Sequence, residues 1–223
     1  ALVWSGDIHS TFESLQNQFA AGLNMGLSGI TWWTTDIGGF FGANIYDEDY
    51  HEVFVRWFEY GTFCPVMRLH GYRMPYQPQF GTTGGAECVS GAPNEIWSYG
   101  DRVYEICKKY MFLREALRPY IKEQMLLTHE KGTPVMRPLF YDFPQDKRAW
   151  EVDDTYMFGT DFCVAPVMEE DVYERSVYLP LGCSWKDVFS GICYEGGQTV
   201  TVDAPMDKIP VFVKAGSKWE INV

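Results

Sequence analysis

The chain has 223 residues, of which 46% are hydrophobic, and this is enough to bury a core in one large domain or two small ones. Its formal net charge is −12 and no basic cluster occurs, which excludes the charge pattern of a nucleic-acid-binding protein. Because no apolar run reaches the length of a membrane span, we expect no membrane-embedded segment.

The cysteines are widely and irregularly spaced. No C-x-x-C pair and no histidine pair at zinc spacing occurs, so we expect buried or free thiols and no metal site. Reduced thiols slightly favour a cytosolic location, and the sequence is otherwise silent on localisation. The six cysteines are Cys64, Cys88, Cys107, Cys163, Cys183 and Cys193.

The first predicted unit is a strand, a loop and a helix. A short apolar run at residues 2–4 stops at Ser5-Gly6-Asp7, which predicts a buried strand that leads into a loop. Ser10 and Glu13 then match an S-x-x-E capping box, and apolar residues follow at helical spacing up to Leu27. We therefore expect a helix that begins at Ser10.

Two similar units follow. Residues 29–35 are β-prone and end at Asp36, and a helical apolar pattern comes after the next loop. Residues 65–69 predict a third strand that stops at His70, and its helix is expected from about residue 95 to residue 130. Alternating strands and helices predict a parallel sheet, and a closed (β/α)8 barrel needs about 250 residues. We therefore predict the last three βα units of a partial (β/α)8 TIM barrel.

The second half has a different pattern. After Gly132, short β-rich runs are bounded by Gly, Pro or Asp, which is typical of an antiparallel β-sandwich. We place the barrel part at residues 1–132 and the sandwich domain at residues 133–223. The predicted strands lie at 155–158, 162–167, 176–179, 199–202 and 211–213.

Three polar residues follow the three predicted strands. Asp7, Asp36 and His70 each stand where an apolar run stops, so in a parallel sheet they share one edge. Each also has a simpler interpretation. A single Asp after a strand is often a helix cap or turn residue, Asp36 precedes a Gly-Gly pair that suits a tight turn with an Asx bond, and a single His is usually an ordinary satisfied side chain.

Together these residues suit the cleavage of a glycosidic bond. One carboxylic acid protonates the leaving oxygen, and a second carboxylate attacks or stabilises the anomeric carbon. Water and carboxylates are sufficient for this chemistry, so it requires neither a metal nor another cofactor. An aromatic content of 17% supplies flat side chains either for a core or for stacking against sugars.

Four ordered blocks make the pattern specific. The blocks W-S-G-D (4–7), L-S-G-I (27–30), D-I-G-G-F (36–40) and R-L-H-G (68–71) resemble glycoside hydrolase family 31 in order and spacing. A further stretch, P-V-F-V-K-A-G-S (210–217), is similar to the end of that family's proximal C-terminal β-domain. The resemblance covers nearly the whole chain.

This resemblance implies roles for individual residues. Asp7 corresponds to the family's general acid/base, and Trp4 to a residue that lines the sugar pocket. Asp36 and His70 correspond to residues that bind sugar hydroxyls in the −1 subsite, and Phe40 to a residue beside that pocket. Trp32 and Trp33 are second-tier candidates for the pocket or the core.

The chain also departs from the family pattern. The family's nucleophile is an Asp in a W-x-D-x-x-E type motif on an earlier strand, and no such motif occurs here. The Arg expected shortly before the acid/base and the first barrel strands are missing as well. The chain begins with Ala rather than Met, so we expect a processed or excised fragment that is inactive alone, with its open barrel edge covered by the missing half of the barrel or by another chain.

Several alternatives stay open for the intact protein. The stretch W-W-T-T-D-I-G-G-F-F resembles the α-xylosidase branch, which acts on oligosaccharides, more than the α-glucosidase branch. A non-catalytic carbohydrate-binding or assembly piece is an alternative of another class. A rival enzymatic interpretation makes Asp36 the nucleophile and Asp7 its acid partner, which requires carboxylates about 5–5.5 Å apart.

Overall fold

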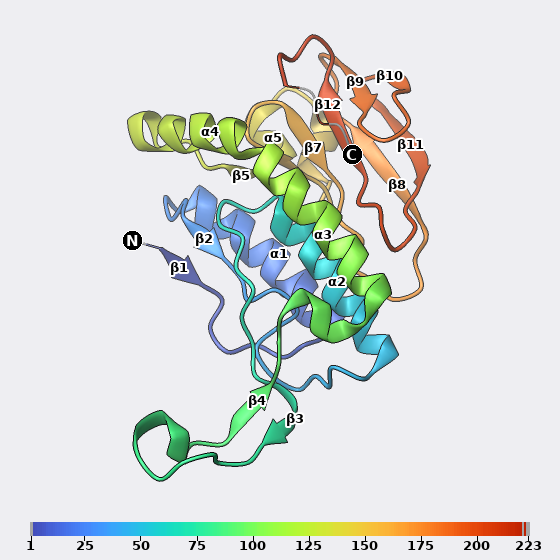
Figure 1. The fold of residues 1–223 in the computed structure, drawn as a ribbon. Helices are drawn as coiled ribbons and strands as arrows, with labels where there is room; N and C mark the ends of the chain where they lie inside the picture. The colour runs from blue at the N-terminus through green and yellow to red at the C-terminus, as the bar shows by residue number, and fades with distance from the viewer. Residues whose placement is uncertain (1, 220, 222–223) are drawn as a thin grey trace.

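The structure is a computed structural model that describes residues 2–219 and 221 (Figure 1). Among these residues, no helix is both long enough and apolar enough to cross a bilayer. The helices are α1 (Phe12–Leu27), α2 (Glu48–Thr62), α3 (Asp101–Ala116), α4 (Arg118–Lys131) and α5 (Leu139–Asp142), with 3-10 turns η1 (Gly84–Glu87), η2 (Ile96–Tyr99) and η3 (Lys147–Trp150). The strands are β1 (Val3–Trp4), β2 (Trp33–Thr34), β3 (Arg73–Gln77), β4 (Ser90–Ala92), β5 (Met136–Pro138), β6 (Tyr156–Phe158), β7 (Phe162–Val164), β8 (Glu174–Leu179), β9 (Ser184–Asp187), β10 (Cys193–Glu195), β11 (Gln198–Asp203) and β12 (Val211–Lys214).

The first two strands form the parallel pair that the sequence predicts. In its register, Val3 pairs with Trp33 and Trp4 pairs with Thr34. The strand predicted at residues 29–35 is shorter than expected, because only two residues on each strand form the ladder. Since the strands are parallel, the loops that follow them leave from the same edge.

The β1–β2 pair has one covered face and one open face. α1 packs against the covered face so closely that a Cβ on Gly22 would lie 2.8 Å from the Trp33 Nε1 atom. Trp33 is therefore a core residue. Because side chains alternate along a strand, Leu2, Trp4 and Trp32 share the opposite face, where each is about half exposed.

The capping box predicted at Ser10 and Glu13 is wrong by one residue. α1 begins after Thr11, whose hydroxyl oxygen accepts a hydrogen bond from the Ser14 amide at 3.2 Å. Ser10 is instead buried, and its amide donates to the Phe41 carbonyl at 3.0 Å. Pairing with the loop after β2 therefore turns Ser10 away from the helix end.

The third predicted strand does not form a ladder within the described chain. Residues 65–69 make one backbone hydrogen bond to another segment, from the Ile37 amide to the Arg68 carbonyl at 3.1 Å. The Thr34 hydroxyl also donates to the Val66 carbonyl at 2.9 Å. These two bonds hold the segment beside β2, although they are too few to make a strand.

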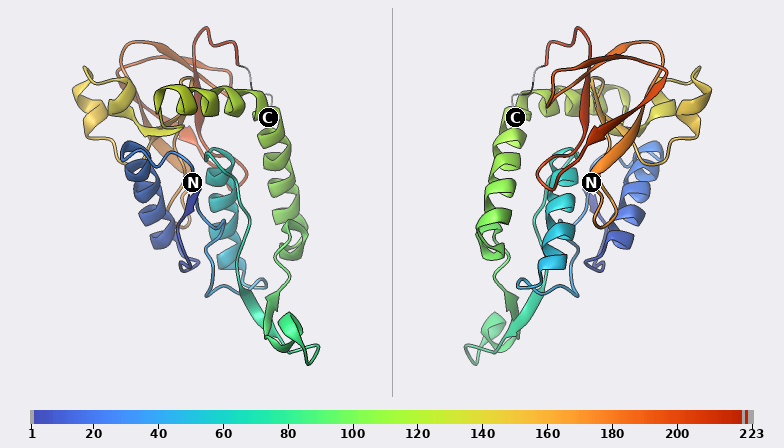
Figure 2. Two further views of the ribbon diagram at one scale, coloured as in Figure 1. Left: turned by 90° about the vertical axis from the view of Figure 1, so that its left-hand side faces the viewer. Right: turned by 90° about the vertical axis from the view of Figure 1, so that its right-hand side faces the viewer.

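The long helix predicted from about residue 95 to residue 130 is two helices. α3 ends at Ala116, Leu117 separates the two, and α4 carries Pro119 in its first turn. Proline suits this place because the first turn of a helix leaves N–H groups unpaired anyway. Figure 2 shows that α4 runs across the molecule at a steep angle to α3. α4 ends at Lys131 and is capped by Gly132, which has a left-handed φ of 70°.

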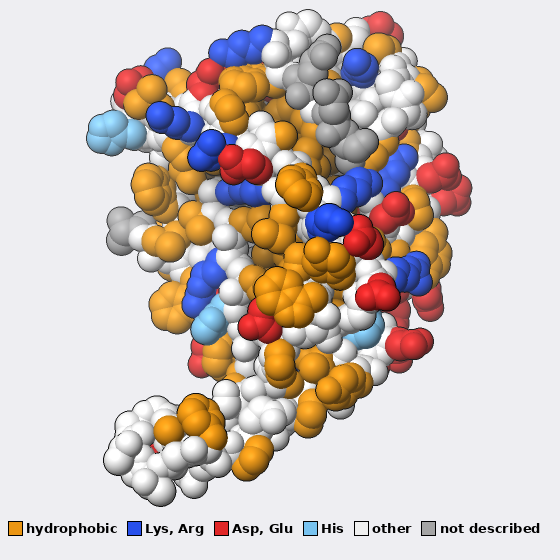
Figure 3. Space-filling view, in the orientation of Figure 1, with side chains coloured by type: hydrophobic (Ala, Val, Ile, Leu, Met, Phe, Trp, Pro, Cys, Tyr) orange, Lys and Arg blue, Asp and Glu red, His pale blue; other side chains and the backbone are white. Residues whose placement is uncertain are grey.

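A hairpin formed by β3 and β4 projects from the body of the molecule (Figures 1 and 2). It follows the third predicted strand, so it leaves from the same edge as the loops after β1 and β2. Figure 3 shows hydrophobic side chains on its surface. Its exposed apolar residues include Tyr76, Phe80 and Val89.

The C-terminal part is a mostly antiparallel β-sandwich, as predicted. Its larger sheet has the strand order β10-β9-β12-β7-β6-β5, and β8 and β11 form a separate antiparallel pair. The five β-rich runs of the sequence correspond to β6, β7, β8, β11 and β12. β5, β9 and β10 were not predicted, because these short segments contain Pro or charged residues and show no alternating pattern.

The central strands of the larger sheet are buried on both faces. In β12, Val211 and Val213 join the core shared with the helices, whereas Phe212 joins the core between the larger sheet and the β8–β11 pair. The same alternation occurs in β6 and β7. The sandwich therefore covers one side of the helical layer and packs against α1 and α2 through the shared core.

Candidate functional site

Backbone hydrogen bonds join the three predicted strand ends in order. The Phe40 amide, in the loop after β2, donates to the Ile8 carbonyl in the loop after β1 at 2.8 Å. The bond from Ile37 to Arg68 joins the same loop to the third segment. The three ends therefore form one continuous edge, which we call the rim. The predicted site residues on or beside the rim are Trp4, Asp7, Asp36, Phe40 and His70.

Asp36 is the buried carboxylate of the rim. It is 0% exposed, and its Oδ1 atom forms an ion pair with the Arg68 guanidinium. Its Oδ2 atom is buried without a hydrogen-bond partner among the described residues. The tight turn of the alternative interpretation is present, closed by a backbone bond from the Gly39 amide to the Asp36 carbonyl at 2.9 Å. Its Asx bond is absent among the described residues, because Oδ1 pairs with Arg68 and Oδ2 has no partner.

The electrostatic environment of Asp36 has opposing parts. Burial raises the pKa of this carboxyl above its ordinary value, since the charged form loses hydration. The positive charge of Arg68 and the His70 ring act in the opposite direction, and the Asp7 carboxylate raises the pKa further. Asp7 and His70 thus lie close enough to Asp36 to influence the charge of its carboxyl group.

Asp7 and His70 differ from Asp36 in exposure. Both side chains are exposed to solvent, and Trp4 is about half exposed. The helix-cap alternative for Asp7 is wrong, because Thr11 caps α1. The His70 ring lies 5.5 Å from the half-buried Phe40 ring, measured between centroids.

Sequence reasoning missed Arg73, which holds the loop after β2. Its side chain is completely buried. Its Nη1 atom donates to the carbonyls of Gly39 and Phe40 at 2.8 and 3.0 Å, and its Nη2 atom donates to the Ile37 carbonyl at 3.2 Å. Its Nε atom donates to the Tyr99 hydroxyl at 3.0 Å. The only available signal was its place two residues after the R-L-H-G block.

The Gly-Gly pair of this loop is required by both conformation and space. Gly38 and Gly39 have φ values of 80° and 74°, a backbone conformation that residues with a side chain rarely adopt. A Cβ on Gly38 would lie 2.5 Å from the Tyr50 hydroxyl, and one on Gly39 would lie 2.6 Å from the His9 carbonyl oxygen. The two glycines therefore let the loop lie against both α2 and the loop after β1.

Neither the rim nor another described region gathers metal ligands. No group of three or more His, Cys, Asp or Glu side chains with suitable geometry occurs among residues 2–219 and 221. The six cysteines are free, and Cys64, Cys107 and Cys163 are buried. The rim itself offers two carboxylates (Asp7 and Asp36), the Arg68 guanidinium, the His70 imidazole and aromatic rings.

Comparison with known proteins identifies the family. Residues 1–124 match the glycosyl hydrolases family 31 TIM-barrel domain. The chain belongs to glycosyl hydrolase family 31. Residues 132–217 match the C-terminal domain of the same family. The family and the fold class predicted from the sequence are therefore confirmed.

Individual relatives extend the comparison for this family 31 chain. It is 38% identical over 217 residues to an alpha-xylosidase of Saccharolobus solfataricus, covering 97% of this chain and 27% of the relative. It is 33% identical over 218 residues to alpha-glucosidase 2 of Bacillus thermoamyloliquefaciens, covering 97% of this chain and 25% of the relative. The chain thus spans about a quarter of the length of these relatives.

Solved structures of family 31 proteins agree over nearly the whole chain. A GH31 alpha-xylosidase from a soil metagenome, complexed with xylose, is 52% identical with a TM-score of 0.95, covering 98% of this chain and 32% of that chain. A GH31 dextranase of Flavobacterium johnsoniae, complexed with glucose, is 34% identical with a TM-score of 0.83, covering 97% of this chain and 25% of that chain.

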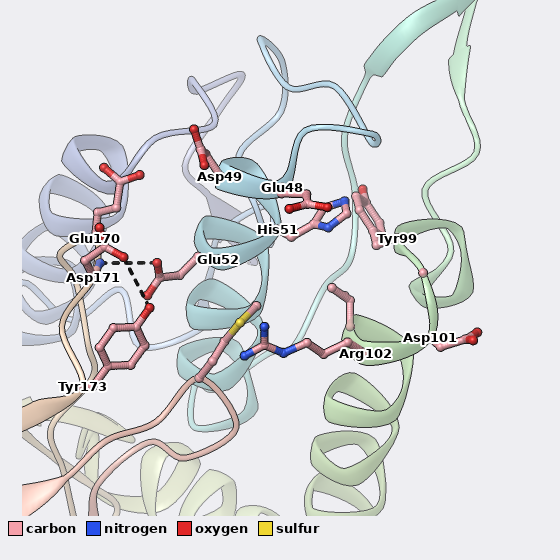
Figure 4. Close-up of a pocket in the computed structure, with 13 residues that line it drawn as sticks. Glu48, Asp49, His51, Glu52, Tyr99, Asp101, Arg102, Glu170, Asp171 and Tyr173 are labelled. Carbon is pink, nitrogen blue, oxygen red and sulfur yellow. Dashed lines mark hydrogen bonds between the residues drawn. The ribbon is translucent and has the colours of Figure 1, made fainter.

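A separate hollow of about 500 Å³ lies where the N-termini of α2 and α3 face a loop of the sandwich domain (Figure 4). Carboxylates dominate its lining. Glu52 accepts a hydrogen bond from the Asp171 amide at 3.3 Å, and Tyr173 donates to the Asp171 carboxylate at the same distance. None of the predicted site residues of this family 31 chain lines this hollow. The carboxylates that line it are those of Glu48, Asp49, Glu52, Asp101, Glu170 and Asp171.

Proposed function

We propose that this chain supplies the acid/base side of the active site of a retaining α-glycoside hydrolase, as part of a longer protein. The observation that carries the proposal is the rim. The parallel β1–β2 pair and the Phe40–Ile8 bond bring the loop of Asp7 against the loop of Asp36. In TIM-barrel enzymes, the catalytic residues stand at the carboxyl ends of the parallel strands.

Asp7 is the general acid/base in this proposal. A nucleophilic Asp outside this chain attacks the anomeric carbon, while Asp7 protonates the leaving oxygen. Asp7 then removes a proton from the water that hydrolyses the glycosyl-enzyme intermediate. Its exposed position allows the carboxyl group to reach both the leaving oxygen and water.

The remaining rim residues bind the sugar. A buried carboxylate oxygen without a partner is costly, so the Oδ2 atom of Asp36 is suited to accept a hydrogen bond from a sugar hydroxyl. His70 offers a second polar contact, and Phe40 and Trp4 offer apolar surface beside it. The complete burial of Asp36 and its ion pair with Arg68 favour this binding role over the rival role as nucleophile.

We propose that the substrate is an α-xyloside at the non-reducing end of an oligosaccharide. The 52% identity to an alpha-xylosidase whose structure contains xylose supports this choice. An α-glucosidase is the alternative within the family, and the similarity to alpha-glucosidase 2 of Bacillus thermoamyloliquefaciens supports it. One extra hydroxymethyl group changes binding by only about 1–3 kcal/mol, so the two activities are close in energy.

The main experiment uses the Asp7→Ala variant of the intact protein. Without the acid, glycosides with poor leaving groups should lose activity by about 10²–10⁴-fold, because their leaving oxygen needs a proton. Activated aryl α-xylosides should keep their first step. Steady-state and burst kinetics on both substrates measure the difference.

A matched control for Asp7→Ala is Asp203→Ala, which removes an exposed carboxylate from β11 of the sandwich domain. This control should keep full activity on both substrates. Equal losses on activated and non-activated substrates in Asp7→Ala would contradict the acid role.

A non-catalytic carbohydrate-binding or assembly role is the alternative from another class. The open face of β1 and β2, with half-exposed Leu2, Trp4 and Trp32, favours a covering partner, and we propose that the rest of the barrel or another chain covers it. Assays of this chain and of the intact protein on aryl α-xyloside and aryl α-glucoside separate the possibilities. Turnover by the isolated chain would show that its own carboxylates suffice, and no turnover by the intact protein would favour the non-catalytic role.

A further inference from the structure

A series of aromatic rings leads from the rim into the β3–β4 hairpin. The Phe40 ring and the Tyr72 ring are nearly parallel, with centroids 6.5 Å apart and an interplanar angle of 20°. Tyr72 then stacks on Tyr76, with centroids 4.7 Å apart and an angle of 20°. We call these three residues the aromatic series.

The backbone under the aromatic series is firmly held. The Met74 amide donates to the Ala43 carbonyl at 2.8 Å, and the Ile45 amide donates to the Met74 carbonyl at 3.1 Å. The Tyr72 hydroxyl donates to the Val89 carbonyl at 3.2 Å, which ties the ring to the other side of the hairpin. The Tyr72 ring is therefore held by both its backbone and its hydroxyl before any ligand binds.

The outer end of the series is open to solvent. Tyr76 is 48% exposed even though Tyr72 covers one of its faces. Since the inner end lies beside His70, the series extends from the proposed −1 subsite toward the projecting hairpin. A half-exposed ring that already stacks on a held ring loses less conformational entropy than a free one when a ligand packs on it.

We infer that Tyr76, supported by Tyr72, is a stacking platform for an aglycone sugar of the oligosaccharide substrate. This inference rests on the proposed function. The apolar C–H face of a pyranose ring packs on a flat aromatic face, which is a common way for a protein to hold a sugar without charge. The hairpin thereby determines a preference for oligosaccharides over short glycosides.

The test compares two substrates in the intact protein. α-Xylosyl fluoride has no aglycone sugar, whereas an α-xylosylated gluco-oligosaccharide fills the positions beyond the cleaved bond. Tyr76→Ala should lower kcat/KM on the oligosaccharide about 5- to 20-fold, the effect of losing one aromatic stacking contact, and change it less than about twofold on the fluoride. Tyr76→Phe should behave like the wild type, because it keeps the ring.

Trp150→Ala is a matched control on a distant part of the molecule. Trp150 is 58% exposed and stacks on Phe140 with centroids 4.5 Å apart, so the substitution also removes an exposed, stacked ring. Its site in η3 lies at the opposite end of the molecule from the hairpin (Figure 2). It should leave the ratio of the two kcat/KM values unchanged.

Two outcomes overturn the inference while leaving the proposed function intact. One is an unchanged ratio in Tyr76→Ala, and the other is an equal loss on both substrates. Titration calorimetry with the oligosaccharide keeps the two proposals separate if the intact protein shows no turnover. Weaker binding by Tyr76→Ala than by wild type then supports the platform. Equal binding by the two proteins, or no binding by either, refutes it.

Discussion

Two arginines organise the loop after β2, residue by residue. Arg68 neutralises the Asp36 carboxylate at the rim, and Arg73 supplies donors to three backbone carbonyls of the same loop. A buried guanidinium is costly unless its N–H groups are used, and Arg73 uses them on a loop that would otherwise have unpaired carbonyls. The position of Asp36 therefore depends on side chains more than thirty residues away.

Gly39 offers a test of this packing at a single position. Gly39→Ala should destabilise the protein by about 3 kcal/mol or more, because it combines an unfavourable positive φ with a Cβ only 2.6 Å from the His9 carbonyl oxygen. Gly29→Ala is the control, since Gly29 has a φ of 85° and open space around it, and should cost about 1 kcal/mol. Urea denaturation of both variants measures the difference. Similar losses of stability in the two variants would show that the close contact of residue 39 with His9 does not affect stability.

The candidate site was predictable only in part. Asp7, Asp36 and His70 could be proposed because each ends an apolar run, and their grouping on one edge is what the coordinates show. Their catalytic and binding roles stay predictions. Arg73 could not be found, since a single arginine between Tyr72 and Met74 looks like an ordinary surface residue until its partners are known.

Helix ends depended on context at the scale of secondary-structure elements. The sequence S-T-F-E offers two hydroxyls for the start of α1, and the pattern favoured Ser10 because Glu13 follows at capping-box spacing. The bond from Ser10 to Phe41 decided in favour of Thr11. A hydrogen bond with a distant loop therefore decided which residue caps the helix, and the local capping-box motif did not.

A pair of substitutions tests the cap assignment. Thr11→Ala should destabilise the protein by about 1 kcal/mol, because the Ser14 amide loses its acceptor. Ser10→Ala should have an effect near zero, since its hydroxyl has no hydrogen-bond partner in the described chain. Thermal unfolding monitored by circular dichroism measures both. A larger loss in Ser10→Ala would restore the original capping box.

A buried ionic group joins the helical layer to the sandwich domain at the scale of the whole molecule. Arg56 of α2 is fully buried, and its guanidinium donates to the carbonyls of Val172, Ala204 and Pro205, each at 2.9 Å. The same guanidinium lies 3.4 Å from the Glu59 carboxylate. The two halves of the chain are therefore held together by polar contacts as well as by the shared core.

Glu59 makes the stability of this junction depend on pH. Burial raises the pKa of its carboxyl from 4.5 to about 8, although the positive charge of Arg56 opposes the shift. Between these values the folded protein holds a proton that the unfolded chain has released, so the free energy of unfolding should fall as pH rises. The slope is at most about 1.4 kcal/mol per pH unit.

Glu59→Gln should remove this slope, because the amide does not titrate. Urea denaturation between about pH 5 and pH 8 measures the free energy of unfolding of both proteins. Glu105→Gln is the control, since Glu105 is exposed on α3, and it should keep the wild-type slope. Parallel curves for wild type and Glu59→Gln would show that Glu59 does not bind a proton in this window.

The border between the two parts of the molecule is a remaining prediction. We place it between residues 132 and 133, where Gly132 ends α4 in a left-handed conformation. The shared core and the contacts of Arg56 cross this border, so separate expression of the two parts should expose apolar surface.

The sequence by itself determined the family, the first two parallel strand–helix units and the antiparallel second domain. These depend on short motifs and on the periodicity of apolar residues, which are properties of neighbouring positions. The tertiary structure alone decided the cap of α1, the break at Leu117, the pairing of β5, β9 and β10, and the roles of Arg68 and Arg73 in holding Asp36. Each of these depends on hydrogen-bond partners or packing neighbours from distant segments, and these partners are known only once the chain has folded.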